Sequence, residues 1–234
     1  MIKITHEKNW ISCHLGKGLY FKRFYRVSPK AHLKVSTILH EIIIGSMLGD
    51  LTVEKPNLSC NARMQFKQSI INKEYIEHLY ELFQEFCGSK PLVMSKFDNR
   101  PNKNKEYSAI KFQTLSLPCF NIYRELFYNS EGQKILPPNL EDLLTVKGLA
   151  YWLMDDSYKS GKGLYICTES FSLSEMQFLI NILKNKFDLE CSSHKVTNGH
   201  RIYIFSTSKD KLINLVQPYF LEHFYYKLDL DKDS

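Results

Sequence analysis

The chain has 234 residues, of which 44% are hydrophobic, so it can bury the core of one large domain or of two small ones. Its net charge is +6, and no apolar run approaches the ~18 residues that a membrane span needs, so we expect no membrane contact. The six cysteines form no C-x-x-C pair, which argues against a zinc ribbon or a compact disulfide framework and favours a reduced compartment.

The first segment, residues 1–35, is predicted to be a basic arm. It carries eight Lys or Arg and a single acid, whereas the rest of the chain is close to neutral. Cations interleaved with aromatic rings suit phosphate contact combined with base stacking. A solvated tail and an organelle targeting segment are the alternatives. The cations concerned are Lys17, Lys22, Arg23, Arg26, Lys30 and Lys34.

Two apolar runs predict helices that end on a carboxylate. The first covers residues 37–50 and ends at Asp50, and the second covers residues 149–156 and ends at Asp156. A helix C-terminus is partly negative, so an aspartate there needs a compensating cation. If the two helices pack side by side, both carboxylates meet at one end. That arrangement predicts a divalent-metal site.

The surroundings of these two runs repeat. We expect a helix at 37–50, a strand pair at 51–68, a helix at 73–87, a strand pair at about 92–115 and a helix at 118–129, with the same order again from residue 147. Short connections between adjacent strands indicate antiparallel or mixed sheets, which makes the fold class α/β (α+β). The predicted organisation is an arm at 1–35, subdomains at 36–130 and 147–234, and a linker at 131–146.

The predicted helix pair is not symmetric. Gly45 and Gly49 leave a smooth face for close approach in the first run. Tyr151 and Asp155 occupy the corresponding places in the second run. The two halves are therefore related by a pseudo-two-fold axis and differ where the helices touch.

Both runs resemble the nine-residue LAGLIDADG motif, with Asp50 and Asp156 at its eighth position. Over residues 36–230 the chain is similar to the two-motif, single-chain homing endonucleases encoded by organelle group I introns. The resemblance implies two pseudo-symmetric subdomains around a central pair of motif helices. It also implies a site-specific double-strand DNA endonuclease whose two aspartates hold Mg²⁺, with Mn²⁺ as a possible substitute and the carbonyls of Gly49 and Asp155 as further ligands.

The same resemblance implies three supporting residues. Lys134 and Lys227 follow the last helix of each half and, by their position, stabilise phosphoryl charge or help to polarise water. Gln65 resembles a polar residue near the nucleophilic water, and its counterpart in the second half falls among residues 166–168, where that role is in doubt.

Strand patterns predict two DNA-reading faces. Alternation separates polar from apolar side chains in the run from 61 to 67, and the run from 105 to 113 repeats this pattern. Arg, Lys, Asn and Gln supply the donors and acceptors that read base edges in the major groove. The candidate reading residues are Asn61, Arg63, Gln65, Lys67, Lys111 and Gln113 in the first half and Lys195, Thr197, Asn198, Arg201 and Tyr203 in the second.

Two non-identical halves predict a monomer that recognises a long, non-palindromic double-stranded DNA site. The expected location is an organelle, with the mitochondrion ahead of the chloroplast. The alternatives are an intron RNA maturase on the same scaffold and a DNA- or RNA-binding protein that has lost cleavage. The presence of both motif acids favours retained catalysis.

Overall fold

The computed structural model describes residues 10–14, 19–23, 28–57, 59–98 and 105–230. In the predicted arm, strands β1 (Trp10–His14) and β2 (Leu19–Arg23) form an antiparallel pair, while Lys17 and Arg26 lie outside the described residues. Lys30 contacts the first half, where its Nζ donates to the backbone oxygens of Glu85 and Cys87. No helix in the described ranges combines the length and apolarity that a membrane crossing requires.

The two halves have the same order of elements. Each begins with a motif helix, continues with a strand pair, a second helix and a second strand pair, and ends with short helices. The first half contains α1 (Thr37–Leu48), β3 (Thr52–Glu54), β4 (Arg63–Ser69), α2 (Lys73–Phe83), β5 (Leu92–Asp98), β6 (Lys105–Gln113) and α3 (Asn121–Phe127). The second contains α5 (Val146–Asp156), β7 (Ser157–Ser160), β8 (Gly163–Ile166), α6 (Leu173–Phe187), β9 (Cys191–Val196), β10 (Gly199–Ile204), α7 (Lys209–Val216) and α8 (Tyr225–Leu228). A short helix, α4 (Leu140–Leu143), lies in the predicted linker.

The sheets confirm the predicted α+β fold class. Their strand orders are β3-β4-β6-β5 and β7-β8-β10-β9, and every pairing is antiparallel, so the mixed alternative is excluded for the described strands. Helix α2 packs on β4 and β6, and α6 packs on β9 and β10. Each sheet therefore has one covered face and one open face.

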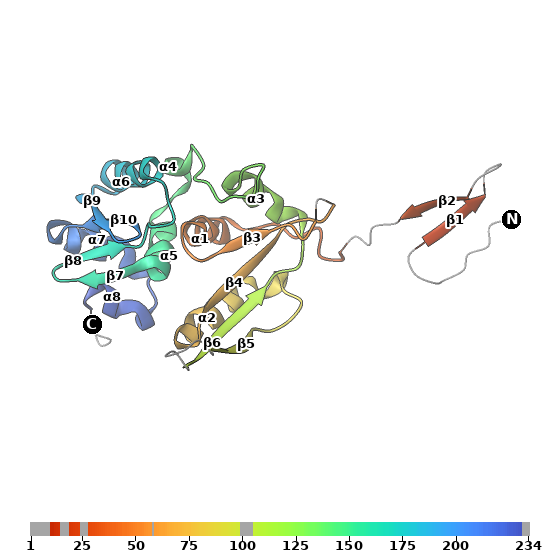
Figure 1. Cartoon of the computed structure of the whole chain (residues 1–234), viewed down its shortest axis with the longest axis horizontal. Helices are drawn as coiled ribbons and strands as arrows, with labels where there is room; N and C mark the ends of the chain where they lie inside the picture. The colour runs from red at the N-terminus through yellow and green to blue at the C-terminus, as the bar shows by residue number, and fades with distance from the viewer. Residues whose placement is uncertain (1–9, 15–18, 24–27, 58, 99–104, 231–234) are drawn as a thin grey trace.

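The motif helices α1 and α5 lie next to each other between the two sheets (Figure 1). Ser36 and Thr145 cap their first turns by accepting from the backbone N–H of Leu39 and Gly148. Both helices are apolar around most of their circumference, as expected for helices that are buried on several sides. The carboxyl ends of both helices meet at one end of the pair.

The helices approach most closely through glycine. A Cβ atom at Gly45 would lie 1.9 Å from the carbonyl oxygen of Gly148, so only glycine fits there. The glycine face of α1 is predictable from the sequence, but Gly148 is not, because the repeat places Tyr151 opposite Gly45. The predicted asymmetry is present one turn later, where a Cβ atom at Gly49 would lie 2.6 Å from both Cβ and Oδ2 of Asp155.

Candidate active site

Three aspartates, Asp50, Asp155 and Asp156, lie at the ends of α1 and α5, near enough for their charges to shift one another's pKa. The Asp155 side chain lies against Gly49, and its Oδ2 accepts from the backbone N–H of Asp50 at 3.4 Å. Burial raises the pKa of Asp50, and the charges of Lys134 and Lys227 oppose that rise. The predicted meeting of Asp50 and Asp156 therefore includes a third acid, Asp155, which was expected to supply only its carbonyl.

The other two carboxylates are still more perturbed. Burial raises the pKa of Asp155 well above its usual range, and the charges of Asp50 and Asp156 add to this. Burial, followed by the charge of Asp50, raises the pKa of Asp156 to about 7. Burial and mutual repulsion thus disfavour the ionised form of all three acids. A divalent cation bound among them would offset both effects.

The two predicted lysines bind the ends of the motif helices. Lys134 Nζ donates to the carbonyl oxygens of Gly49 (3.0 Å) and Leu51 (3.1 Å). Lys227 is only 7% exposed, and its Nζ donates to the carbonyls of Met154 (2.5 Å), Asp155 (3.3 Å) and Leu153 (3.4 Å). Cations at helix C-termini compensate the helix dipole, so both lysines also have a structural role.

Donor capacity distinguishes the two lysines. An ammonium group has three N–H donors, and the three carbonyls around Lys227 match that number. Lys134 donates to two carbonyls, which leaves one donor for an incoming phosphoryl oxygen. The sequence around Lys227 matches the family better than the sequence around Lys134 does and favours Lys227, whereas the geometry favours Lys134 for contact with substrate.

The donor set fits a hard divalent cation. Within the described ranges, no three His, Cys, Asp or Glu side chains are placed to hold a metal ion by themselves. Mg²⁺ binds through one or two carboxylates, retains waters and accepts substrate phosphates, so the carboxylates of Asp50 and Asp156 suit it. The carbonyls of Gly49 and Asp155, predicted as further ligands, both accept from a lysine here. Their role as metal ligands stays a prediction.

Gln65 is not in the predicted place. Its Nε2 donates to Glu54 at 2.7 Å, and Gln68 occupies the site instead, with Nε2 2.7 Å from Asp50 Oδ2 and 3.4 Å from Asp155 Oδ1. Successive side chains of a strand point to opposite faces of the sheet. Gln68 lies three residues after Gln65, so it points to the other face, the one that carries Met64 and Phe66.

The strand register also corrects the predicted residue-by-residue correspondence between the two halves. Gln65 pairs with Thr52, two residues after Asp50, and Tyr165 pairs with Tyr158, two residues after Asp156. Tyr165 is therefore the counterpart of Gln65, not one of residues 166–168. By the same register the counterpart of Gln68 is Thr168, whose hydroxyl donates to the carbonyl of His200 at 2.9 Å.

The raised pKa of Asp155 predicts how stability depends on pH without metal. An unfolded aspartate ionises near pH 4, so the parent should lose stability as the pH rises from there through the higher folded pKa. Asp155→Asn removes this titration. We expect the variant to melt at a higher temperature than the parent at pH 8 in EDTA and at a similar temperature at pH 4, as measured by differential scanning fluorimetry.

The exposed acid Glu131 supplies the control for this comparison. The difference in melting temperature between Glu131→Gln and the parent should stay nearly constant across the same pH range. If Asp155→Asn instead melted below the parent at pH 8, the hydrogen bonds of the carboxylate would outweigh the cost of its burial.

The open face of the first sheet carries the predicted polar residues together. Glu54 accepts from Arg63 Nε at 2.5 Å and from Gln65, so it orients both side chains. Lys67 pairs directly with Lys111 across the strands, an unfavourable like-charge pair that a polyanion would relieve. Gln65, Lys67, Lys111 and Gln113 line a hollow of about 240 Å³. Asn61 instead accepts a bond from Asn121 of α3.

The open face of the second sheet is aromatic. Arg201 pairs with Glu169 and donates to the Tyr158 hydroxyl at 2.6 Å. Tyr203 stacks on His194 with ring centroids 5.0 Å apart. Lys195 was predicted to share this face, but it pairs with His200, so it lies on the opposite side of β9 from His194. Thr197 and Asn198 are exposed in the β9–β10 turn.

Comparison with known proteins agrees with this geometry. The model of the LAGLIDADG DNA endonuclease family matches residues 40–212. The cytochrome b mRNA maturase bI2 of Saccharomyces cerevisiae is 34% identical over 201 residues, which are 80% of this chain and 46% of that protein. The probable intron-encoded endonuclease 1 of Wickerhamomyces canadensis is 32% identical over 202 residues, which are 83% of this chain and 85% of that protein.

A solved structure matches the fold. The homing endonuclease I-WcaI bound to its DNA recognition sequence superposes with a TM-score of 0.78 at 31% identity, covering 85% of this chain and 89% of that one. The chain spans less than half the length of the yeast maturase and most of the length of the two endonucleases.

Proposed function

The chain belongs to the LAGLIDADG DNA endonuclease family, and we propose that it cuts both strands of double-stranded DNA at one long, non-palindromic site. The observation that supports this most directly is that each half keeps its motif acid at the end of a motif helix. Asp156 is the last residue of α5, and Asp50 follows the C-cap of the adjacent helix α1. The unlike faces of the two sheets favour two unlike half-sites.

We propose that the carboxylates of Asp50 and Asp156 hold Mg²⁺. When bound, the metal would activate water and stabilise the leaving 3′-oxygen of a scissile phosphodiester. Three side chains of the protein would position the acids and the phosphate. Gln68 fixes the Asp50 carboxylate through its amide, and Lys134 offers its remaining N–H to the phosphoryl oxygens. Lys227 holds the end of α5 in place, so that Asp156 stays beside Asp50.

Both arginines of the open faces are oriented before DNA binds, because each is paired with a glutamate. Such preorganisation reduces the entropy cost of binding. Arg63→Ala and Arg201→Ala should each cost about 1–3 kcal/mol at particular base pairs, since base-edge contacts carry sequence information. Selection of cleavable sites from randomised DNA should place the two relaxed positions in opposite half-sites.

Lys184→Ala is the control for this selection, because Lys184 is exposed on α6, which packs on the other face of the second sheet. The DNA sites selected by the Lys184→Ala variant should be the same as those selected by the parent. Unchanged preferences in both arginine variants would contradict base reading by these strands.

The function itself is tested with purified protein, Mg²⁺ and intron-free organelle genes carried on plasmids. A discrete double-strand break, mapped by sequencing the new ends to one position in one gene, is the expected result. Absence of any discrete cut, with the protein folded and bound to DNA, would contradict the proposal. Ca²⁺ in place of Mg²⁺ should permit binding without cleavage.

A second candidate function rests on the relatives named cytochrome b mRNA maturases, of which the yeast protein is 34% identical to this chain. We propose that the scaffold can also bind intron RNA. An in vitro splicing assay with Asp50→Asn separates the activities, because RNA folding assistance should survive the loss of a metal-binding acid.

We also propose that the protein is a monomer and that it acts in an organelle, the mitochondrion before the chloroplast.

We propose as well that the N-terminal arm contacts DNA. Removal of residues 1–35 should weaken DNA binding most at low salt and leave the position of the cut unchanged, since phosphate contacts carry no sequence information.

A further inference from the structure

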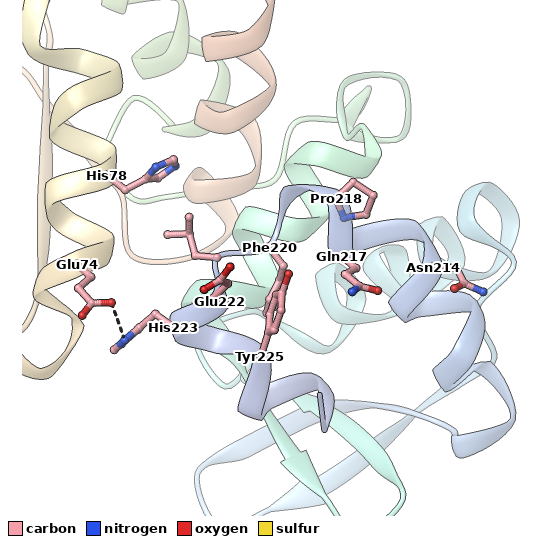
Figure 2. Close-up of a pocket in the computed structure, with 10 residues that line it drawn as sticks. Glu74, His78, Asn214, Gln217, Pro218, Phe220, Glu222, His223 and Tyr225 are labelled. Carbon is pink, nitrogen blue, oxygen red and sulfur yellow. Dashed lines mark ion pairs between the residues drawn. The ribbon is translucent and has the colours of Figure 1, made fainter. Parts of the chain in front are cut away.

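A cleft of about 770 Å³ separates α2 from the C-terminal segment of the second half. Figure 2 shows Glu74 and His78 on the α2 side and Glu222, His223 and Tyr225 on the other. The two histidines have different partners. His78 Nε2 lies 2.7 Å from the Tyr151 hydroxyl, whereas His223 Nδ1 lies 3.5 Å from Glu74 and its Nε2 lies 3.3 Å from Asn72 Oδ1.

The contacts of His223 continue to the active site. Asn72 Nδ2 donates to Gln68 Oε1 at 3.1 Å, and Gln68 Nε2 donates to Asp50 Oδ2 at 2.7 Å. A chain of contacts thus runs from Glu74 through His223, Asn72 and Gln68 to Asp50. It starts at the cleft and ends on a carboxylate proposed to hold metal.

The chemistry of each group fixes the direction of this chain. An ionised carboxylate only accepts, so Gln68 must turn its NH₂ toward Asp50 and its oxygen toward Asn72. Asn72 must then donate to that oxygen, which turns its own oxygen toward His223. His223 must therefore carry a proton on Nε2. Without His223, Asn72 loses the partner of its Oδ1 and is held less firmly, which weakens its hydrogen bond to Oε1 of Gln68, the contact that supports the Gln68 amide from the side opposite Asp50.

The chain of contacts also crosses between the halves. Asp50, Gln68 and Asn72 belong to the first half, and His223 belongs to the second. His223 lies four residues before Lys227 across the turns that end the second half, where residues four apart share a helix face. One helical segment thus reaches both ends of the site, because Lys227 holds the end of α5 beside Asp156 and His223 reaches Asp50 through two amides.

We propose that Asn72 and His223 are positioning residues for the Asp50 side of the site, and that His223 makes metal binding on the first half depend on the second. This rests on the proposed function for the meaning of the Asp50 site. The two residues act through Gln68 and touch neither DNA nor metal. The shorter contact of Gln68 is to Asp50 (2.7 Å, against 3.4 Å to Asp155), and the chain of contacts does not include Asp156, so their loss acts mainly on the Asp50 side and the two strands of the DNA respond differently.

The test compares the parent with His223→Ala, His223→Gln, Asn72→Ala and His78→Ala. The first measurement is a calorimetric titration with Mn²⁺, which needs no DNA. Residues that orient metal ligands typically contribute 10–100-fold to metal affinity or activity, and the remote position of His223 favours about tenfold. His223→Ala and Asn72→Ala should raise the Mn²⁺ concentration at half-saturation by about that factor. His223→Gln should restore it, because a glutamine amide can donate to Asn72.

The second measurement follows the cutting of each strand on a duplex labelled separately at its two 5′ ends. His223→Ala should slow one strand about tenfold, leave the other at the parent rate and leave DNA affinity unchanged, so that nicked DNA accumulates. His78→Ala, from the same cleft, should match the parent because His78 is outside this chain of contacts. Asn72→Ala should slow the same strand as His223→Ala.

Three results would overturn the proposal. They are equal slowing of both strands, a His223→Ala variant that matches the parent in both measurements, and a His223→Gln variant as impaired as His223→Ala. Failure of the proposed function has a different signature, because the parent would then bind Mn²⁺ and cut no DNA. In that case the Mn²⁺ titration alone decides whether Asn72 and His223 position Asp50.

Discussion

Asp50→Asn or Asp156→Asn should abolish double-strand cleavage while DNA binding stays within a few-fold of the parent. Each substitution removes a charged oxygen ligand of the proposed metal and keeps the size of the side chain. Metal ions contribute several kcal/mol of transition-state stabilisation, and each 1.4 kcal/mol is tenfold in rate, so we expect a loss on the order of 10³-fold or more. Binding should be spared because the role proposed for these acids is to hold metal beside the phosphate, not to contact base edges.

The measurement is single-turnover cleavage at pH 8 in Mg²⁺, where Asp156, with a pKa of about 7, is ionised in the parent. Binding is measured in Ca²⁺ by fluorescence anisotropy. Both variants should remain folded in EDTA, since each removes a carboxylate whose ionisation is disfavoured by burial. Unimpaired cutting by either variant would refute the assignment of that aspartate.

Gly45→Ala should be strongly destabilising although alanine is the better helix former. Helix propensity alone predicts a gain of roughly 0.5–1 kcal/mol. The new methyl group would instead lie 1.9 Å from the Gly148 carbonyl oxygen, and backbone cannot rotate away as a side chain can. We expect a loss of about 3 kcal/mol, at the upper end of the range for over-packing, which lowers the melting temperature by roughly 10 °C.

Gly88→Ala is the matched control, because the nearest atom to its methyl group would be Cδ2 of the Leu115 side chain, at 3.0 Å, and a rotation of that side chain relieves the contact. Its melting temperature should lie close to that of the parent. A Gly45→Ala variant that melted higher than the parent would show that the motif helices can separate at little cost. Reduced cleavage should accompany the loss of stability, since separation of the helices moves Asp50 away from Asp156.

Several features of the fold followed from local sequence pattern. Apolar runs predicted α1 and α5, whose first turns Ser36 and Thr145 cap in the structure, and alternation predicted the polar face of β4. The repeat then implies two similar subdomains, because one pattern gives the same local structure twice. The acids Asp50 and Asp156 could be identified for the same reason, since each closes an equivalent apolar run, although α1 ends at Leu48 and not at the predicted residue 50. Family membership and fold class were therefore predictable, and both are confirmed.

The sequence by itself thus determined the main helices and strand pairs of both halves, their order, the fold class and the two motif acids, but not the β1–β2 pair or helix α4. Tertiary structure decided how the helices cross and which side chains reach the acids. The contact of Gly45 with Gly148, the choice of Gln68 over Gln65 and the separation of Lys195 from Arg201 all depend on crossing geometry and strand register. The physical reason is that a shift of one residue in register reverses the face of every side chain, and residues far apart in sequence meet only after the register and the helix crossing are fixed.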